Sequence, residues 1–355
     1  MIERDDLRAD VGSGLLSEAQ AANLISLADS RRGARENLSA GDEPFELFKG
    51  FNEIFIVVGL IILAFGWSVM VGVVVSNMMS DLQFYTMVAS AAGAVILWLL
   101  AEYFVRKRRM VAPAIALSVM FAGNAGTGLF AGLSEPFMLA QNDFSSLPLP
   151  MILATAAVLV FWWRFRVPFA MAMIAVGLFA TAIVYTASQS GPVDDITDLF
   201  LLSADGPFAW ITLALGLAVF AVAMIFDMSD PHRVTRRAAN GFWLHVVAAP
   251  ALVNTVALTL LERDTSGAQM LLMGILLLFA VVAIIIDRRS FLIAGVGYIV
   301  TVAGALFDGE GAAASILILG VVLLLLGAFW ERIRAVFLRA LGPVLPLRRL
   351  PPSHL

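Results

Sequence analysis

Cysteine is absent from this chain of 355 residues, and its absence excludes several classes of chemistry. Without thiols there is no disulfide, no thiolate nucleophile and no metal bound through sulfur. Charged residues are scarce as well, at 14% of the chain, whereas about 25% is usual in a soluble domain. Because 60% of the residues are hydrophobic, we expect most of the chain to face lipid or other apolar helices.

Short motifs for catalysis and nucleotide binding are missing too. The chain contains no Gly-rich phosphate loop, no HExxH zinc motif and no GxSxG nucleophile elbow. The sequence therefore predicts a protein that is not an enzyme, with no cofactor, no metal centre and no nucleic-acid partner.

Residues 1–50 form the only sizeable polar segment. The N-terminus lacks the basic and short apolar stretches of a cleavable signal peptide, so we expect the first apolar helix to direct insertion. Ser17 and Gln20 have the spacing of a capping box at the start of a helix over about residues 18–32. A shorter helix over residues 4–11 would pack on it as a hairpin. Four residues share one stripe of the longer helix: Ala21, Leu24, Ile25 and Ala28.

Four phenylalanines recur at helical spacing just before the apolar region: Phe45, Phe48, Phe51 and Phe55. Aromatic rings are common at the depth of lipid headgroups. We interpret this stretch as an interfacial segment that leads into the first membrane helix. The alternative is a dedicated partner-binding face.

About ten apolar segments follow, each long enough to cross a bilayer. They lie near residues 52–78, 83–104, 110–133, 147–163, 167–186, 207–227, 239–261, 268–286, 290–307 and 312–330. The fold class is therefore predicted as an all-α polytopic integral membrane bundle. Its parts would be a cytoplasmic hairpin and interfacial segment (1–50), a ten-helix membrane domain (51–331) and a basic cytoplasmic tail (332–355).

The distribution of charge supports both the number of spans and their orientation. With the N-terminus in the cytoplasm and ten crossings, 22 of the 23 Lys and Arg residues fall on the cytoplasmic side, and only Arg263 falls outside. The outer loops carry mostly acids. Basic residues near the ends of spans favour the cytoplasm, and a missed helix would invert every later loop. We therefore predict that both termini are cytoplasmic.

Acids stand near bases at several cytoplasmic span ends. Such pairs are Glu102 with Arg106, Asp287 with Arg288, Glu331 with Arg334, and Asp227 and Asp230 before Arg233. We interpret them as solvated helix-end pairs that contribute roughly a few tenths of a kcal/mol each; the alternative is a gate. The outer loop 187–206 is predicted to hold a short surface helix, and Asp194 and Asp198 could bind a cation there.

No Asp, Glu, Lys or Arg lies near the centre of any predicted span. This weighs against transport coupled through a buried carboxylate. His245 remains, near the cytoplasmic end of the seventh span. It could accept a proton or bind a substrate, since its ordinary pKa is about 6.5. It could equally form an interhelical hydrogen bond or reach the headgroups.

Neutral polar residues in three spans are the other candidates for a cavity lining. In the seventh span, Pro250 should loosen the helix, and Asn254 points roughly opposite to His245. In the third span, Asn124 and Thr127 share a face, and Gly128 and Gly132 form GxxxG. These suit close helix packing or a polar cavity wall. Tyr298 and Thr301 in the ninth span could face the same cavity.

Two stretches carry a resemblance to a known family. They are Leu15-Leu-Ser-Glu-Ala-Gln-Ala-Ala-Asn-Leu and Phe242-Trp-Leu-His-Val-Val-Ala-Ala-Pro-Ala-Leu-Val. The first, followed by a many-helix apolar domain, resembles the DUF2157-type membrane proteins of bacteria. The second is similar to a phrase of uncharacterised bacterial membrane proteins. The resemblance implies the bacterial inner membrane and carries no activity with it.

Two functions remain open at this stage. The first is transport of a small or amphiphilic molecule through a cavity lined by the third, seventh and ninth spans. Ten spans suit two five-helix repeats, although the two halves show no clear similarity. The second is a non-catalytic scaffold or sensor whose N-terminal hairpin binds a protein partner. The lipid bilayer is the expected surrounding in both, and the oligomeric state is left open.

Overall fold

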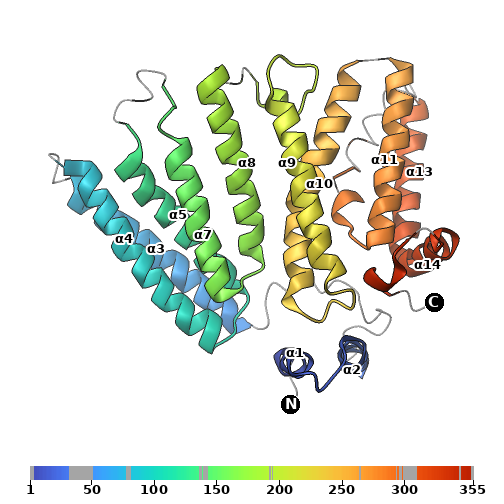
Figure 1. Cartoon of the computed structure of the whole chain (residues 1–355), viewed down its shortest axis with the longest axis horizontal. Coiled ribbons are helices and arrows are strands. Elements are labelled where there is room, and N and C mark those ends of the chain that lie inside the picture. Colours follow the sequence, from blue (N-terminus) through green and yellow to red (C-terminus); the bar gives the residue numbers. More distant parts are fainter. Residues whose placement is uncertain are drawn as a thin grey trace. The chain divides into compact units, whose positions relative to one another are not determined.

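The computed structural model describes residues 4–31, 51–76, 81–135, 138, 143–191, 193, 195–263, 265–292, 294–295, 298, 310–343 and 345–352. These residues form helices joined by turns and short loops, with no strand among them (Figure 1). The prediction of an all-α fold is confirmed. Apolar helices satisfy their own backbone hydrogen bonds, which is what a chain of this composition needs in lipid.

Eight helices of the described chain are long and apolar enough to cross a membrane. They are α3 (Phe51–Ser76), α4 (Leu82–Ala101) with its π-helical extension η2 (Glu102–Lys107), α5 (Ala112–Leu133), α7 (Pro148–Phe165), α8 (Phe169–Ser190), α9 (Phe208–Met228), α10 (Arg236–Glu262) and α11 (Ser266–Ile286). They coincide with the first eight predicted spans. The ninth lies mostly outside the described residues, and α13 (Glu310–Ala328) covers most of the tenth.

Shorter helices flank these spans. They are α1 (Arg4–Ser13), α2 (Glu18–Arg31), the 3-10 helix η3 (Ile196–Leu199), α14 (Trp330–Leu341) and the 3-10 helix η4 (Leu347–Arg349). The short helix predicted in the outer loop is thus confirmed as η3. Asp195 and Asp198 close it as a capping box, so the Asp198 carboxylate accepts a backbone N–H there. Asp194, the other half of the predicted cation pair, lies outside the described residues.

The chain divides into two compact units. The α3–α8 unit comprises Pro44–Asp194 and Gly206–Ile211, and the α9–α14 unit comprises Met1–Glu43, Asp195–Asp205 and Thr212–Leu355, including α1 and α2. In α3 only 6% of the apolar membrane-length stretch is buried inside the structure, whereas in α10 the buried share of that stretch is 61%. Helix α10 is therefore an interior helix of its unit, whereas α3 presents most of its surface outward.

Close packing of α4 on α5 organises the α3–α8 unit. A Cβ on Gly128 would lie 2.7 Å from the Ser90 Cβ, and one on Gly132 would lie 2.9 Å from the Met87 sulfur. At Gly128 only glycine permits this approach, whereas at Gly132 the flexible Met87 side chain can shift. The GxxxG pair thus acts in helix packing as predicted. An aromatic cluster lies in the same unit, with the Trp98 and Phe165 rings 4.9 Å apart.

The start of α5 is held by a carboxylate from α3. Glu53, which is 5% exposed, accepts hydrogen bonds from the backbone N–H groups of Val111 (3.3 Å) and Ala112 (3.0 Å). The first N–H groups of a helix have no partner within it, and the helix dipole favours a negative charge there. Glu53 thus fixes the ends of α3 and α5 to each other.

The N-terminal hairpin is confirmed, with one correction to its packing. Ser17 and Gln20 form the capping box: the Ser17 N–H donates to Gln20 Oε1 (2.9 Å), and the Gln20 N–H donates to Ser17 Oγ (3.3 Å). The buried side of α2 is formed by Ala21 and Ala22, whereas Leu24 is 45% exposed. The prediction that placed Leu24 on the packed stripe was wrong, because the two small alanines allow the closer approach.

Candidate functional site: a buried charge network

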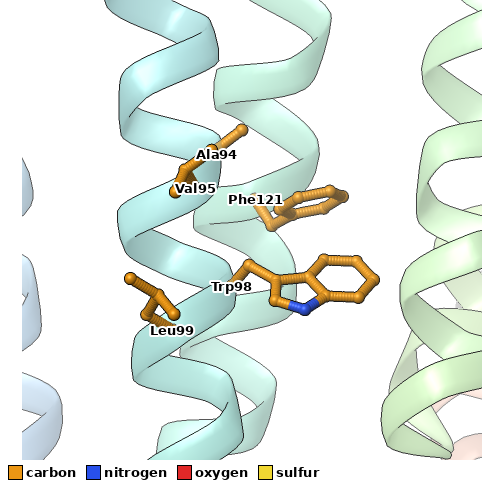
Figure 2. A pocket seen from close by; sticks show the side chains of 5 residues that line it. All are labelled: Ala94, Val95, Trp98, Leu99 and Phe121. Atoms are coloured by element: carbon orange, nitrogen blue, oxygen red, sulfur yellow. The ribbon is translucent and has the colours of Figure 1, made fainter.

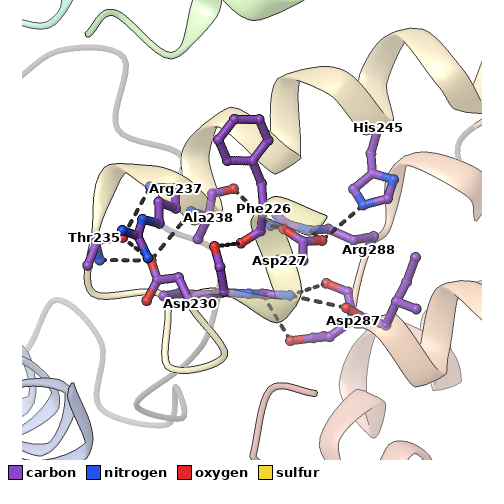
Figure 3. Close-up of polar contacts among 12 residues, drawn as sticks. Phe226, Asp227, Asp230, Thr235, Arg237, Ala238, His245, Asp287 and Arg288 are labelled. Carbon is purple, nitrogen blue, oxygen red and sulfur yellow. Dashed lines mark hydrogen bonds and ion pairs between the residues drawn. The ribbon is translucent and has the colours of Figure 1, made fainter. Parts of the chain in front are cut away.

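A buried cluster of charged and polar side chains lies at one end of the α9–α14 unit (Figure 3). The last turn of α9, the loop from α9 to α10, the first half of α10, the turn after α11 and the start of α14 contribute to it. Its charged members are buried: Asp227, Asp230, Asp287, Arg288 and Arg334. Such burial is costly unless every charge is paired and hydrogen-bonded, so the pairing defines the site.

Asp227 lies at the centre of the first part of the network. Its Oδ2 is 2.9 Å from His245 Nε2 and accepts a 2.9 Å hydrogen bond from Arg288 Nε, and its Oδ1 accepts a 2.5 Å bond from Arg288 Nη2. The guanidinium therefore binds the carboxylate in the two-pronged geometry that is strongest for this pair. Arg288 Nη2 also donates to the Ala238 carbonyl (2.9 Å), which links α11 to α10.

His245 is fully buried within this cluster. Its ring lies edge-on to Phe220 and Phe291, with centroids 5.4 and 5.9 Å away. The interpretation of His245 as an interhelical hydrogen-bonding residue is confirmed, and the idea that it reaches the headgroups is wrong. These two aromatic rings lie against the imidazole, and Asp227 faces its Nε2 (Figure 3).

A glycine on α10 makes room for the Asp227 carboxylate. A Cβ on Gly241 would lie 3.0 Å from Asp227 Cγ and 3.2 Å from the Ala223 carbonyl oxygen. Both neighbours belong to α9, so α9 and α10 are in close contact where the network begins. A larger residue at this position would displace the carboxylate from Arg288.

Asp287 organises the second part of the network. Its Oδ2 forms an ion pair with Arg233 Nη1 (3.0 Å), and its Oδ1 accepts a 2.6 Å hydrogen bond from Trp330 Nε1. Burial alone would raise the pKa of this carboxyl. Attraction to Arg233 and then to Arg334, with the Trp330 hydrogen bond, instead holds the pKa below its ordinary value. The charged form is thus the stable one, and α14 is tied to the end of α11.

Asp230 holds the loop between α9 and α10. It is 1% exposed, and it accepts hydrogen bonds from the N–H groups of Val234 (3.2 Å) and Thr235 (2.8 Å) and from the Thr235 hydroxyl (2.7 Å). Thr235 in turn caps α10 by accepting from the Arg237 N–H. These bonds satisfy donors that the start of a helix leaves open, so the loop has a fixed shape.

The prediction of solvated acid–base pairs at the span ends is only partly correct. Glu102 and Arg106 form such an exposed pair, at 3.0 Å. At the other end of the chain the prediction was wrong, because Asp287 pairs with Arg233 and Arg288 pairs with Asp227, all within the buried network. Asp287 has the left-handed backbone conformation, with φ of 58°. The turn at this residue directs the Asp287 side chain toward Arg233 and the Arg288 side chain toward Asp227.

The other predicted cavity residues of the α9–α14 unit are distributed as follows. Asn254 accepts a 2.9 Å hydrogen bond from the Tyr298 hydroxyl, which joins two of the predicted candidates. Pro250 is exposed and lies within α10, which is helical on both sides of it. Pro250 was predicted to loosen the helix, but α10 continues through it. Thr301 lies outside the described residues.

Asn124 and Thr127 belong to the α3–α8 unit, where both form hydrogen bonds. The Asn124 amide donates to the Ser90 carbonyl of α4, and its side chain fills the space above Gly93. Thr127 donates to the Gly123 carbonyl of its own helix at 2.9 Å. These contacts suit the packing interpretation of Asn124.

A shallow hollow of about 230 Å³ lies on the same unit, between α4 and α5. Figure 2 shows its lining residues, which are Ala94, Val95, Trp98, Leu99 and Phe121. The lining is apolar and includes none of the predicted cavity residues. Such a surface suits contact with hydrocarbon.

Within the described chain, no three acidic or histidine side chains gather as a metal site. The sequence-based predictions named His245 but missed its partner Asp227, 18 residues before it, and the binding of Arg288, 43 residues after it, to the same carboxylate. The adjacency of Asp287 and Arg288 was the available signal, and it suggested the wrong pairing.

Comparison with protein-family models, curated proteins and solved structures finds no match to this chain.

Proposed function

We propose that the chain is a ten-span protein of the bacterial cytoplasmic membrane, with both termini in the cytoplasm, that acts as a non-catalytic sensor or scaffold. Eight apolar helices support the membrane assignment. The segregation of basic residues supports the orientation. The resemblance to DUF2157-type membrane proteins agrees with this location and is part of the same proposal. In this proposal the N-terminal hairpin binds a protein partner.

The docking of the hairpin on the α9–α10 loop is the observation that carries the proposal. Arg8 Nε donates to the Val234 carbonyl (2.9 Å). Leu7, Ala21, Ala22 and Val234 form one buried cluster. Val234 lies in the loop that Asp230 shapes and the charge network anchors. A change in the packing of α9 against α10 would therefore alter the surface on which the hairpin sits.

The outer side of the hairpin offers apolar contact area to a partner. Leu15 is 76% exposed, Leu24 45% and Leu27 49%. Large exposed apolar patches mark interaction sites, and these three exposed leucines belong to one small hairpin. The hairpin thus has one side on the membrane domain and one side open.

Affinity purification of the full chain tests the proposal. The double variant Leu24→Glu/Leu27→Glu alters the outer side, and Asn23→Arg, at a neighbouring exposed position, is the matched control. We expect at least one protein to be recovered with the wild type and the control but not with the double variant or with a chain lacking residues 1–44. Identical sets of recovered proteins from all four chains would remove the sensor or scaffold proposal.

Transport of a small or amphiphilic molecule is the second candidate. The division of the chain near the start of α9 leaves five predicted spans in each unit, as in transporters built from two repeats. The partly buried Asn254–Tyr298 pair supplies polar groups within apolar helices. A thermal-shift screen of small amphiphiles against the wild type and Asn254→Ala tests it. A transported ligand should stabilise only the wild type, and absence of any stabilising ligand counts against transport.

A further inference from the structure

The C-terminal segment carries arginine and no acid. After Glu331 the chain contains Arg332, Arg334, Arg339, Arg348 and Arg349 and no Asp or Glu up to its last residue. The chain as a whole has a net charge of −4, so this end is electrostatically distinct. A segment of one sign attracts a partner of the other sign when its charges are exposed and fixed in position.

One of these arginines serves to fold the segment. Arg334 is fully buried. Its guanidinium donates to the carbonyls of Pro351 and Pro352, the latter at 3.2 Å. Leu350 is buried beside them. The tail therefore returns to α14 and is held there, and α14 itself is anchored by the Trp330–Asp287 hydrogen bond.

The other four arginines are exposed: Arg332, Arg339, Arg348 and Arg349. Within the described chain none of them forms an ion pair with a carboxylate, although Arg332 lies over the Phe329 ring at 5.7 Å and Arg339 donates to the Ala335 carbonyl. Arginine at an exposed position offers a planar fork of donors that matches phosphate oxygens. The segment thus presents four cations whose charges are not neutralised by neighbouring acids.

Apolar side chains accompany these cations. Arg332 and Arg339 are two helical turns apart and share a face of α14, with Val336 (58% exposed) between them. Leu347 at the start of η4 is 45% exposed beside Arg348 and Arg349. Alternation of guanidinium groups with aliphatic side chains fits the boundary between headgroups and acyl chains, where each finds its own environment.

The place of α14 in the chain brings this surface to a membrane boundary. Only Phe329 separates α14 from α13, which covers the predicted tenth span. Helix α14 is also in contact with the end of α11, one of the eight helices that are long and apolar enough to cross a bilayer. An exposed basic helix so close to the ends of two spans meets lipid headgroups before it meets a soluble partner.

We infer that the face formed by Arg332, Val336, Arg339, Leu347, Arg348 and Arg349 binds the phosphate headgroups of anionic phospholipids. The inference rests on the membrane placement in the proposed function but does not depend on a partner of the N-terminal hairpin. Anionic lipid would fix the C-terminal segment to the cytoplasmic leaflet. The binding weakens with salt, because exposed charges are screened.

Binding of short-chain lipids to the purified full chain in neutral detergent tests the inference. Fluorescent phosphatidylglycerol is the probe, and phosphatidylcholine is the uncharged comparison. Replacing the four exposed arginines with Gln should raise the dissociation constant for phosphatidylglycerol about 600-fold, because each basic residue at an anionic surface contributes roughly fivefold. Lys at the same four positions should restore most of the binding, which separates charge from folding.

A matched variant distinguishes this face from basic charge in general. Gln at Arg106, Lys107, Arg108 and Arg109 removes the same charge from the exposed end of η2 and the residues that follow it and should leave the dissociation constant nearly unchanged. Equal weakening by both sets of substitutions, or equal affinity for the two lipids, overturns the inference. The affinity-purification result for the hairpin is measured separately, so the two proposals can fail independently.

Discussion

Arg288 and Arg289 are neighbours in the chain with opposite environments. Arg288 is 2% exposed and binds Asp227, whereas Arg289 is exposed and lies over the Trp330 ring at 5.2 Å. Removal of a buried partner leaves the other charge unpaired, which costs about 3–5 kcal/mol. An exposed cation over a ring contributes about 0.5–1 kcal/mol. The two positions therefore form a matched pair for substitution.

We expect Arg288→Ala to lower the melting temperature of the detergent-solubilised protein strongly and Arg289→Ala to lower it slightly. Tryptophan fluorescence on heating measures both. The double variant Arg288→Ala/Asp227→Ala should be less damaging than the single Arg288→Ala variant, because no unpaired carboxylate remains. Similar melting temperatures for the two single variants would contradict the buried ion pair.

Asp287 predicts a dependence of stability on pH. Burial alone would raise its pKa, but Arg233, then Arg334 and the Trp330 hydrogen bond hold it below the ordinary value, which is about 3.9 in an unfolded chain. The folded state then binds fewer protons than the unfolded state. The stability from this carboxylate is present above about pH 4 and is lost as the pH falls through the lowered folded pKa.

The variant Asp287→Asn measures this contribution. Its melting temperature should lie below that of the wild type by a constant amount from about pH 7 to pH 5. The difference should shrink as the pH falls below about 4, because the unfolded wild-type chain then binds a proton that the folded state does not. Asp205→Asn, at an exposed position, is the control and should differ little at any pH. A difference that persists unchanged in acid would show that Asp287 acts through packing alone.

Among whole elements, the N-terminus of α5 depends on a side chain from another helix. Glu53 of α3 accepts from two of its first N–H groups. Glu53→Ala should destabilise the protein by about 1–3 kcal/mol, because one buried and one partly buried N–H donor lose their acceptor. Hydrogen exchange of the amides at the start of α5 should speed up in the same variant. Asn52→Ala, at the exposed neighbouring position, should leave both measurements unchanged, and an equal effect would refute the capping role.

Helix α10 shows how an element is set partly by its sequence and partly by its neighbours. Its length and its start at Thr235 follow from local residues, since Thr235 caps it and its apolar run can cross a bilayer. Pro250 suggested a break, yet α10 runs through it and Pro250 is exposed. Packing of both halves in the unit interior keeps the helix in one piece, which a local rule does not capture.

At the scale of the whole molecule, the absence of cysteine gives a direct test of topology. Single cysteines at Ser13, Ile196 and Arg348, all exposed, can be labelled without background from native thiols. With ten spans and both termini inside, a membrane-impermeant maleimide should label Ile196→Cys in intact cells. Ser13→Cys and Arg348→Cys should react only after the membrane is opened. Labelling of Arg348→Cys but not of Ser13→Cys in intact cells would mean an odd number of spans between the termini, and labelling of both would mean the opposite orientation.

The sequence by itself determined the helices and their membrane character. An apolar run of sufficient length must satisfy its own backbone hydrogen bonds in lipid, and only a helix does so within one segment. The eight spans, the hairpin and the Ser17–Gln20 capping box depend on residues close together in the chain. The residues needed to predict them were therefore all visible in one stretch.

Only the tertiary structure decided which charge meets which. Asp227 pairs with Arg288, 61 residues away, and the choice depends on the space above Gly241 and on the left-handed turn at Asp287. Sequence adjacency suggested a solvent-exposed pair of Asp287 with Arg288, whereas helical neighbours that meet are three or four residues apart. Burial reverses this preference, since an enclosed charge must take whichever partner the packed helices bring within hydrogen-bond distance.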